Sequence, residues 1–138
     1  MRRKTRKEIG VRIFSLDQIS NLKVMETTFP LPKAFTAEDY FKDVYGITTG
    51  MNGPLQTIEL QVANARANYF RALPLHHSQK ELVEKKDDEY SYFTYELRPS
   101  NDFYQALLHH AEHVEVISPK EVREAMATKV RAMAEKYQ

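Results

Sequence analysis

Two clusters hold all five histidines, and histidine is the side chain that most often binds metals or moves protons near neutral pH. One cluster is His76-His77, and the other is His109-His110 followed by His113. On one continuous helix, His109 and His113 would share a face at the i, i+4 spacing that suits zinc. However, no glutamate follows His109 directly, and the helix should end near Ala111. We therefore expect no metal site and interpret these histidines as surface or helix-end residues, which the helix dipole favours.

The segment His76-His77-Ser78-Gln79 lies where a predicted helix passes into a predicted strand, so its side chains reach the sheet. Successive strand residues point to opposite faces, so a serine close to a histidine in sequence is not by itself a catalytic pair. Two interpretations stay open: a polar network that holds the junction together, or hydrogen bonds to a ligand. A free-standing small enzyme that uses His76 and His77 is an alternative of a different functional class.

Several chemistries are excluded by residue types that are missing or too few. The chain has no cysteine, which excludes disulfides, thiolate metal sites, iron–sulfur clusters and a cysteine nucleophile. Its four glycines cannot be arranged as GxGxxG or as a P-loop, so nucleotide binding by those two folds is excluded. We expect no resident cofactor and no enzymatic activity.

One predicted strand is rich in aromatic side chains, with Tyr90, Tyr92, Phe93 and Tyr95 close together. Such a strand resembles the stacking platform of single-strand nucleic-acid binders, which is a second alternative function. Basic side chains are missing from the strand until Arg98, and three acidic residues precede it. The pattern therefore favours packing in the core and between strands.

Charge is distributed unevenly along the 138 residues, although the net charge is only +1. Residues 1 to 12 hold six basic residues against Glu8 and carry +5, while the remainder carries −4. A short basic run is usually solvated, so charge alone does not indicate nucleic-acid binding. No apolar run reaches the roughly 18 to 20 residues of a membrane helix, and none follows the basic amino end as in a signal peptide. We expect a cytoplasmic protein without membrane contact.

The first third of the chain predicts a β-hairpin and a connector. Residues 11 to 16 and 22 to 26 read as two short strands, which cannot bury a face without further strands. Residues 29 to 35 contain two prolines and read as a connector. Thr36 is the predicted cap of a short helix that ends at Gly46, and residues 47 to 54 read as a loop.

From Leu55 onwards the chain alternates between strand and helix patterns. Strands are predicted at 58 to 62, 75 to 83, 90 to 97 and 113 to 117, with Phe93, Tyr95 and Leu97 on one face of the third. Helices are predicted over 65 to 73 and from Pro99-Ser100 to Ala111. The order β-α-β-β-α-β predicts an α+β fold, a ferredoxin-like sandwich with helices on one face of an antiparallel sheet.

A long amphipathic helix is predicted after Ser118, with Ser118 as its cap and Pro119 as its first residue. An apolar stripe recurs along it at spacings of four and three, through Val122, Met126, Val130, Met133 and Tyr137. This stripe is longer than one side of a small sheet needs. We expect the stripe to hold a homodimer, with packing on its own domain as the alternative.

An ordered set of motifs resembles the C-terminal part of WYL-domain transcriptional regulators. The motifs are RIFSLDQI, then F-x5-F-x4-YF-x3-YGI, then LPLHHSQ and finally VEVISPKEVRE. RIFSLDQI is similar to the last hairpin of the Sm-like WYL domain, with Gln18 in place of the arginine usual in the family's LDRI-like motif. The part from about residue 55 is similar to the C-terminal extension of these regulators.

The resemblance implies an effector-sensing, dimerising regulatory domain of a bacterial regulator whose DNA-binding helix-turn-helix is missing from this chain. It divides the chain into the end of the WYL barrel (1–28), a linker with a short helix (29–54), the ferredoxin-like extension (55–118) and the terminal helix (119–138). We expect a small-molecule or nucleotide effector to contact residues of the hairpin and the junction together: Arg12, Gln18, His76, Ser78 and Gln79.

Overall fold

The computed structural model describes residues 11–46 and 53–138, in two compact units that divide after Lys33. The basic run of residues 2 to 7 and most of the loop predicted at 47 to 54 lie outside the described residues. Each unit is described by itself below.

The first unit has no strand among its described residues, 11 to 33. It holds one 3-10 turn, η1 (Leu16–Gln18), and every described residue in it is exposed, including Phe14 and Leu16. The predicted β-hairpin over residues 11 to 26 is therefore wrong. The physical reason is that two short strands bury too little apolar surface on their own, and no strand among the described residues pairs with this segment.

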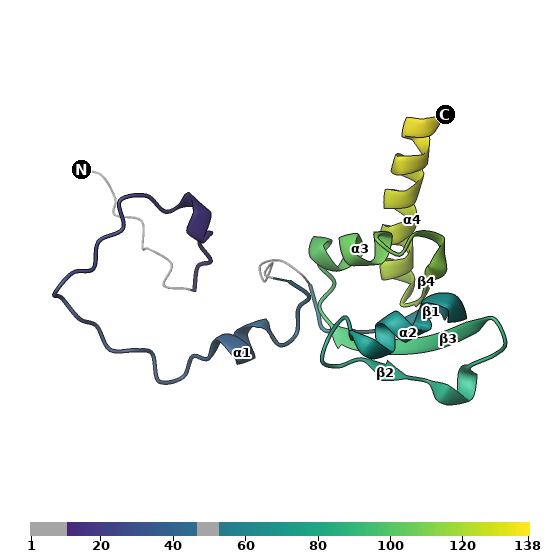
Figure 1. Cartoon of the computed structure of the whole chain (residues 1–138), viewed down its shortest axis with the longest axis horizontal. Coiled ribbons are helices and arrows are strands. Elements are labelled where there is room, and N and C mark those ends of the chain that lie inside the picture. Colours follow the sequence, from purple (N-terminus) through teal and green to yellow (C-terminus); the bar gives the residue numbers. More distant parts are fainter. Residues whose placement is uncertain (1–10, 47–52) are drawn as a thin grey trace. The chain divides into compact units, whose positions relative to one another are not determined.

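The second unit, Ala34–Gln138, has a four-stranded antiparallel sheet. Its strands are β1 (Gln56–Ala63), β2 (Lys80–Glu81), β3 (Tyr90–Leu97) and β4 (Val114–Ser118), in the order β2-β3-β1-β4. The helices α2 (Asn64–Ala72) and α3 (Asn101–Leu108) connect β1 to β2 and β3 to β4 (Figure 1). This order is that of the split βαβ sandwich, so the predicted α+β, ferredoxin-like fold is confirmed.

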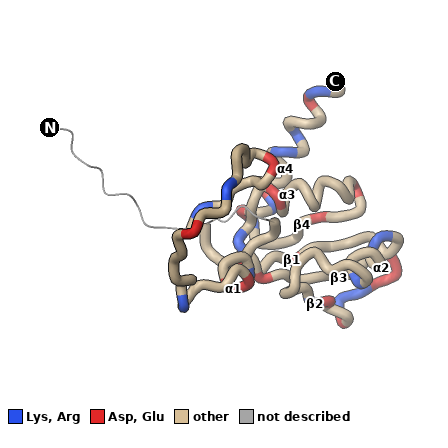
Figure 2. Tube along the Cα trace, turned by 60° about the vertical axis from the view of Figure 1, so that its left-hand side comes forward, with Lys and Arg blue, Asp and Glu red and all other residues tan. Residues whose placement is uncertain are grey.

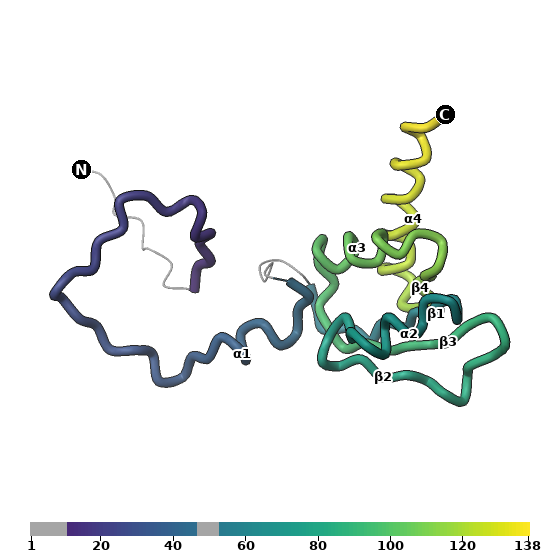
Figure 3. Tube along the Cα trace, in the orientation of Figure 1, coloured from purple at the N-terminus to yellow at the C-terminus, as the bar shows by residue number. Residues whose placement is uncertain are grey.

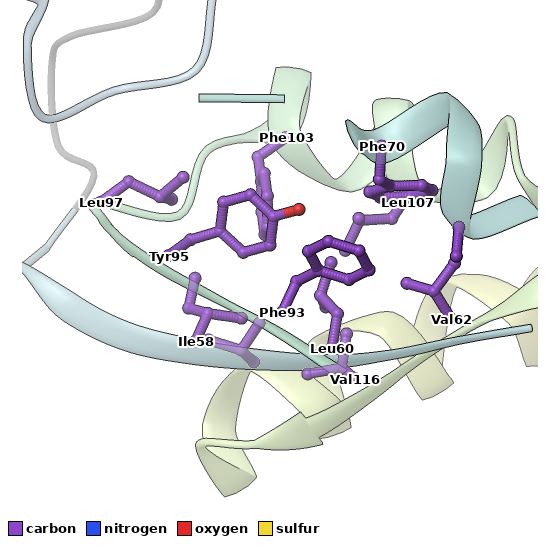
Figure 4. Close-up of a cluster of buried hydrophobic side chains, with 12 residues drawn as sticks. Ile58, Leu60, Val62, Phe70, Phe93, Tyr95, Leu97, Phe103, Leu107 and Val116 are labelled. Carbon is purple, nitrogen blue, oxygen red and sulfur yellow. The ribbon is translucent and has the colours of Figure 1, made fainter. Parts of the chain in front are cut away.

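The core forms between one face of the sheet and the two connecting helices. Alternate residues of β1 and β3 are buried, and these include Phe93, Tyr95 and Leu97 as predicted. Figure 4 shows Phe70 of α2 and Phe103 of α3 directed towards these strand side chains. The period-two burial pattern on both central strands explains why the sequence predicted this face correctly.

The second unit begins with a short segment that precedes the sheet. Helix α1 (Ala37–Phe41) begins after Thr36, whose hydroxyl accepts a hydrogen bond from the backbone N–H of Asp39 as predicted. Val44 is buried and pairs with Arg98 at the end of β3. Gly46 has a φ of +77°, and a Cβ there would lie 2.5 Å from the Asp102 carboxylate, so glycine is needed at this turn.

The terminal helix α4 (Lys120–Ala134) begins one residue later than predicted. Ser118 completes β4 opposite Glu59, so Pro119 takes the capping position and the helix starts at Lys120. A 3-10 turn, η4 (Glu135–Tyr137), continues the helix to the carboxyl end. Figures 1 and 3 show the outer turns of α4 extending away from the sheet.

Candidate functional site

The side chain of Gln79 joins the end of α2 to the sheet. Its Nε2 donates to the Phe70 carbonyl at 2.7 Å, and its Oε1 accepts from the Leu75 N–H at 3.1 Å and from the Tyr95 hydroxyl at 2.7 Å. Both ends of the amide are therefore occupied by groups of the protein. Burial raises the pKa of Tyr95, so its hydroxyl remains a donor to Gln79.

Ser78 extends the pairing of β2 with β3 through its side chain. Its hydroxyl accepts from the backbone N–H of Glu96 at 2.9 Å and lies 3.2 Å from the Glu96 carbonyl. This contact replaces backbone pairing at this point. It explains why β2 spans only Lys80–Glu81, although the sequence predicted an extended run over 75 to 83.

The two adjacent histidines of the junction have different surroundings. His76 is 8% exposed, and its Nδ1 lies 2.7 Å from the Ser78 hydroxyl. Burial, and then the neighbouring His77, lowers the pKa of His76. His77 is exposed, and its Nε2 lies 2.6 Å from the Lys42 carbonyl. These contacts connect the junction to β3 and to the segment after α1.

The junction residues therefore use their polar atoms within the protein, as the structural interpretation predicted. Among the buried polar side-chain atoms of this junction, the exception is Nε2 of His76, which has no hydrogen-bond partner in the described part of the chain. Arg12 and Gln18, predicted to share a ligand with this junction, are exposed residues of the first unit. The shared site stays a prediction.

A cavity of about 360 Å³ opens beside α2 and the end of α3. Apolar groups make up most of its lining: Tyr45, Tyr69, Phe70, Leu73, Leu75 and Ala106. Arg66, His109 and His110 add nitrogen donors. No carboxylate is present among the described residues that line it, so the cavity combines an apolar wall with basic groups.

His110 lies between the cavity and the core. Its ring packs against Phe70 at a centroid distance of 4.7 Å, and its Nδ1 is buried with no hydrogen-bond partner in the described part of the chain. Burial lowers the pKa of His110, and its basic neighbours His109, Arg66 and His113 lower this pKa further. The site therefore disfavours additional positive charge.

The sequence did not predict this cavity, because the pattern indicated only that the histidines lie at the surface or at the end of a helix. Helix α3 does end at Leu108, with His109 as its cap, but His110 turns inward against Phe70. Arg66 and Tyr69 carry no motif that would mark them. No cluster of three metal-ligating side chains occurs within residues 11–46 and 53–138.

The apolar stripe of α4 is covered only at its inner end. Val122 is 1% exposed and Met126 packs against the core, whereas Val130 and Met133 are about half exposed and Tyr137 is 90% exposed. A groove of about 310 Å³ runs between β4 and α4 and reaches Val130. Figure 2 shows basic residues along the outer half of the helix.

On the aromatic strand β3, the side chains divide between the two faces of the sheet. Phe93 and Tyr95 are buried in the core. On the opposite face, the hydroxyl of Tyr92 accepts from Gln61 Nε2 at 2.9 Å, and Lys85 lies over its ring at 5.1 Å. Packing therefore accounts for these rings, as the sequence pattern favoured.

Comparison with known proteins identifies the family of the second unit. The WCX domain matches residues 54–134, which include the whole sheet and α4, and this domain is associated with WYL-type regulators. No curated protein matches the sequence. None of the helices in the described ranges is long and apolar enough to cross a membrane. Because the match covers more than half of the 138 residues, the chain belongs to the WCX domain family.

Proposed function

We propose that this chain is the effector-sensing and dimerising part of a cytoplasmic, bacterial WYL-type transcriptional regulator. In this proposal the regulator binds DNA through a helix-turn-helix that is not in this chain. The observation that carries the proposal is the WCX match over residues 54–134, in a domain family associated with such regulators. The cavity beside α2 supports a ligand-binding role, because its volume lies within the range of small-molecule sites.

The proposal gives the chain no enzymatic activity. Ser78 and His76 could be considered as a nucleophile and its base, since the Ser78 hydroxyl lies 2.7 Å from Nδ1 of His76. The Ser78 hydroxyl already hydrogen-bonds the backbone of Glu96, and this bond holds β2 against β3. A structural role therefore accounts for both side chains without a reaction.

A ligand screen on the full chain tests the effector-sensing half of the proposal. The probes are fractions of low-molecular-weight extract from bacterial cells, and the readout is the midpoint of thermal unfolding. A ligand that binds only the native state stabilises it by about 2.7 kcal/mol at a hundredfold excess over Kd. We expect at least one fraction to raise the midpoint. The absence of any shift across all fractions would contradict effector sensing.

Sedimentation equilibrium tests the dimerising half, and the structure improves the choice of variant. Met126 packs against the core, so an aspartate there would also destabilise the fold. Val130 and Met133 are half exposed, so the double variant Val130→Asp/Met133→Asp changes the outer stripe alone. We expect a wild-type dimer at micromolar concentration and a folded monomer for the double variant.

The control for sedimentation is Thr128→Asp, an exposed position on the same helix outside the stripe. It adds negative charge to α4 without removing an apolar side chain, and we expect it to remain a dimer. A wild-type chain that stays monomeric at high micromolar concentration would refute dimerisation.

A further inference from the structure

The cavity beside α2 presents basic groups that have no acidic partner. The guanidinium of Arg66 lies 5.3 Å from the centre of the Tyr69 ring and forms no ion pair with any described residue. By contrast, Arg71 on the same helix pairs with Glu81, and Arg123 pairs with Glu115. An arginine held on an aromatic ring beside a cavity is positioned to receive an anion.

The mouth of the same cavity exposes large apolar side chains. Leu73 is 80% exposed and Tyr69 is 62% exposed, while Phe70 forms part of the buried wall behind them. Aromatic rings favour stacked or edge-on contact with a flat ligand. The apolar wall therefore suits a ring system better than a fully polar molecule.

A third observation comes from the histidines at the inner end. The Nδ1 of His110 is buried and has no partner among the described residues, and His109 is exposed beside it. A buried polar nitrogen without a hydrogen bond is costly, and a bound ligand or water that supplies the missing bond would remove this cost. The basic groups surround the cavity from α2 and from the end of α3.

We propose that this cavity binds a small aromatic anion, a ring system of one or two rings that carries one carboxylate or phosphate. The ring would pack against Tyr69, Phe70 and Leu73, and the anionic group would lie near Arg66 and the two histidines. The volume of about 360 Å³ admits a ligand of this size. The inference rests on the proposed function, because it names the site and the ligand class of the effector.

Nuclear magnetic resonance titration of the full chain tests this site with defined probes. The probes are 1-naphthoate and phenyl phosphate, with neutral 1-naphthamide and inorganic phosphate as comparisons. We expect both aromatic anions to give saturable shifts confined to amides of residues 66–73 and 106–110. 1-Naphthamide lacks the charge and so loses a charge-assisted hydrogen bond, while inorganic phosphate lacks the ring and so loses the apolar contact. Each should therefore bind at least about tenfold more weakly than the aromatic anions.

Variants then locate the anion and the ring separately. Arg66→Gln should weaken the binding of 1-naphthoate about tenfold, and Leu73→Ser should weaken it through loss of apolar contact. Arg66 lies on α2 outside the core cluster, and Leu73, the residue that caps this helix, is 80% exposed, so the fold should persist, which the unshifted spectrum of the remaining residues verifies. The matched control is Arg131→Gln on α4, an exposed arginine outside this cavity, which should leave the affinity unchanged.

Three results would overturn the inference. The first is the absence of a saturable shift with either aromatic anion at concentrations up to about 10 mM. The others are equal affinity for 1-naphthoate and 1-naphthamide, and unchanged affinity for 1-naphthoate in Arg66→Gln. Failure of the proposed function is a separate result. Saturable binding that depends on Arg66, in a chain that stays monomeric and gives no thermal shift with any cell fraction, would support the cavity and contradict the regulatory role.

Discussion

At the residue scale, the side-chain amide of Gln79 connects the parts of the junction that the sequence predicted to be polar. Gln79 bonds to groups of α2, the following loop and β3, so it connects three segments. The spacing of His76, Ser78 and Gln79 predicted a junction, but it did not predict which partner each side chain would choose. The partners on β3, Tyr95 for Gln79 and Glu96 for Ser78, lie 16 and 18 residues away, and sequence proximity carries no information about them.

Removing this amide should cost stability in a way that depends on Tyr95. Gln79→Ala leaves the buried Tyr95 hydroxyl unpaired, and we expect a loss of about 1 to 3 kcal/mol in the free energy of unfolding. Tyr95→Phe removes the hydroxyl itself. In the double variant the loss should be smaller than the sum of the two single losses, because the unpaired group is gone. Urea denaturation measures all three, and strict additivity would contradict the proposed hydrogen bond.

His76 and His110 should make stability depend on pH. Burial lowers the pKa of His76 and of His110 in the folded state below the value of 6.5 that applies in the unfolded chain. Between these values the unfolded state binds more protons, so stability is fully present above pH 6.5 and falls as the pH decreases through the folded pKa values. Urea denaturation at pH 7 and pH 5 measures this loss.

His76→Asn separates the contribution of His76 from that of His110. Asparagine retains a polar group near Ser78 but does not titrate in this range. We expect the loss of stability between pH 7 and pH 5 to be smaller in the variant than in the wild type. An equal loss in both proteins would show that His76 keeps its usual pKa.

At the scale of elements, the α+β order was predicted correctly because both central strands bury alternate residues over their full length. Helix α3 was predicted to open at Pro99-Ser100, and in the structure Ser100 caps it, since its hydroxyl accepts from the Phe103 N–H. The hairpin at 11 to 26 was wrong because alternation alone does not supply partner strands. The predicted strand at 75 to 83 was longer than β2 (Lys80–Glu81), because the side chain of Ser78 replaces part of the backbone pairing.

Helix α4 should divide into an inner half that stabilises the fold and an outer half that does not. Val122 is 1% exposed, whereas Val130 is 49% exposed. Val122→Ala should lower the free energy of unfolding by about 2 kcal/mol, through lost burial and a cavity. Val130→Ala should change it far less at concentrations below dimerisation. Similar losses in the two variants would contradict this division.

For the whole molecule, the WCX match and the ferredoxin-like order agree on what the second unit is. The regulatory role proposed above requires in addition that two copies of the chain associate. The sequence predicted the family context from motifs spread over the chain. It could not predict the cavity beside α2, because that cavity forms only when α2, the end of α3 and Tyr45 come together in three dimensions.

A dimer-dependent reporter tests the central claim most directly. The full chain is fused to a helix-turn-helix domain that binds a palindromic operator only as a dimer, and repression of the reporter gene is measured. The account predicts strong repression by the wild-type fusion, its loss in Val130→Asp/Met133→Asp, and its retention in Thr128→Asp. A wild-type fusion that is expressed and folded but represses no better than the isolated DNA-binding domain would contradict the account.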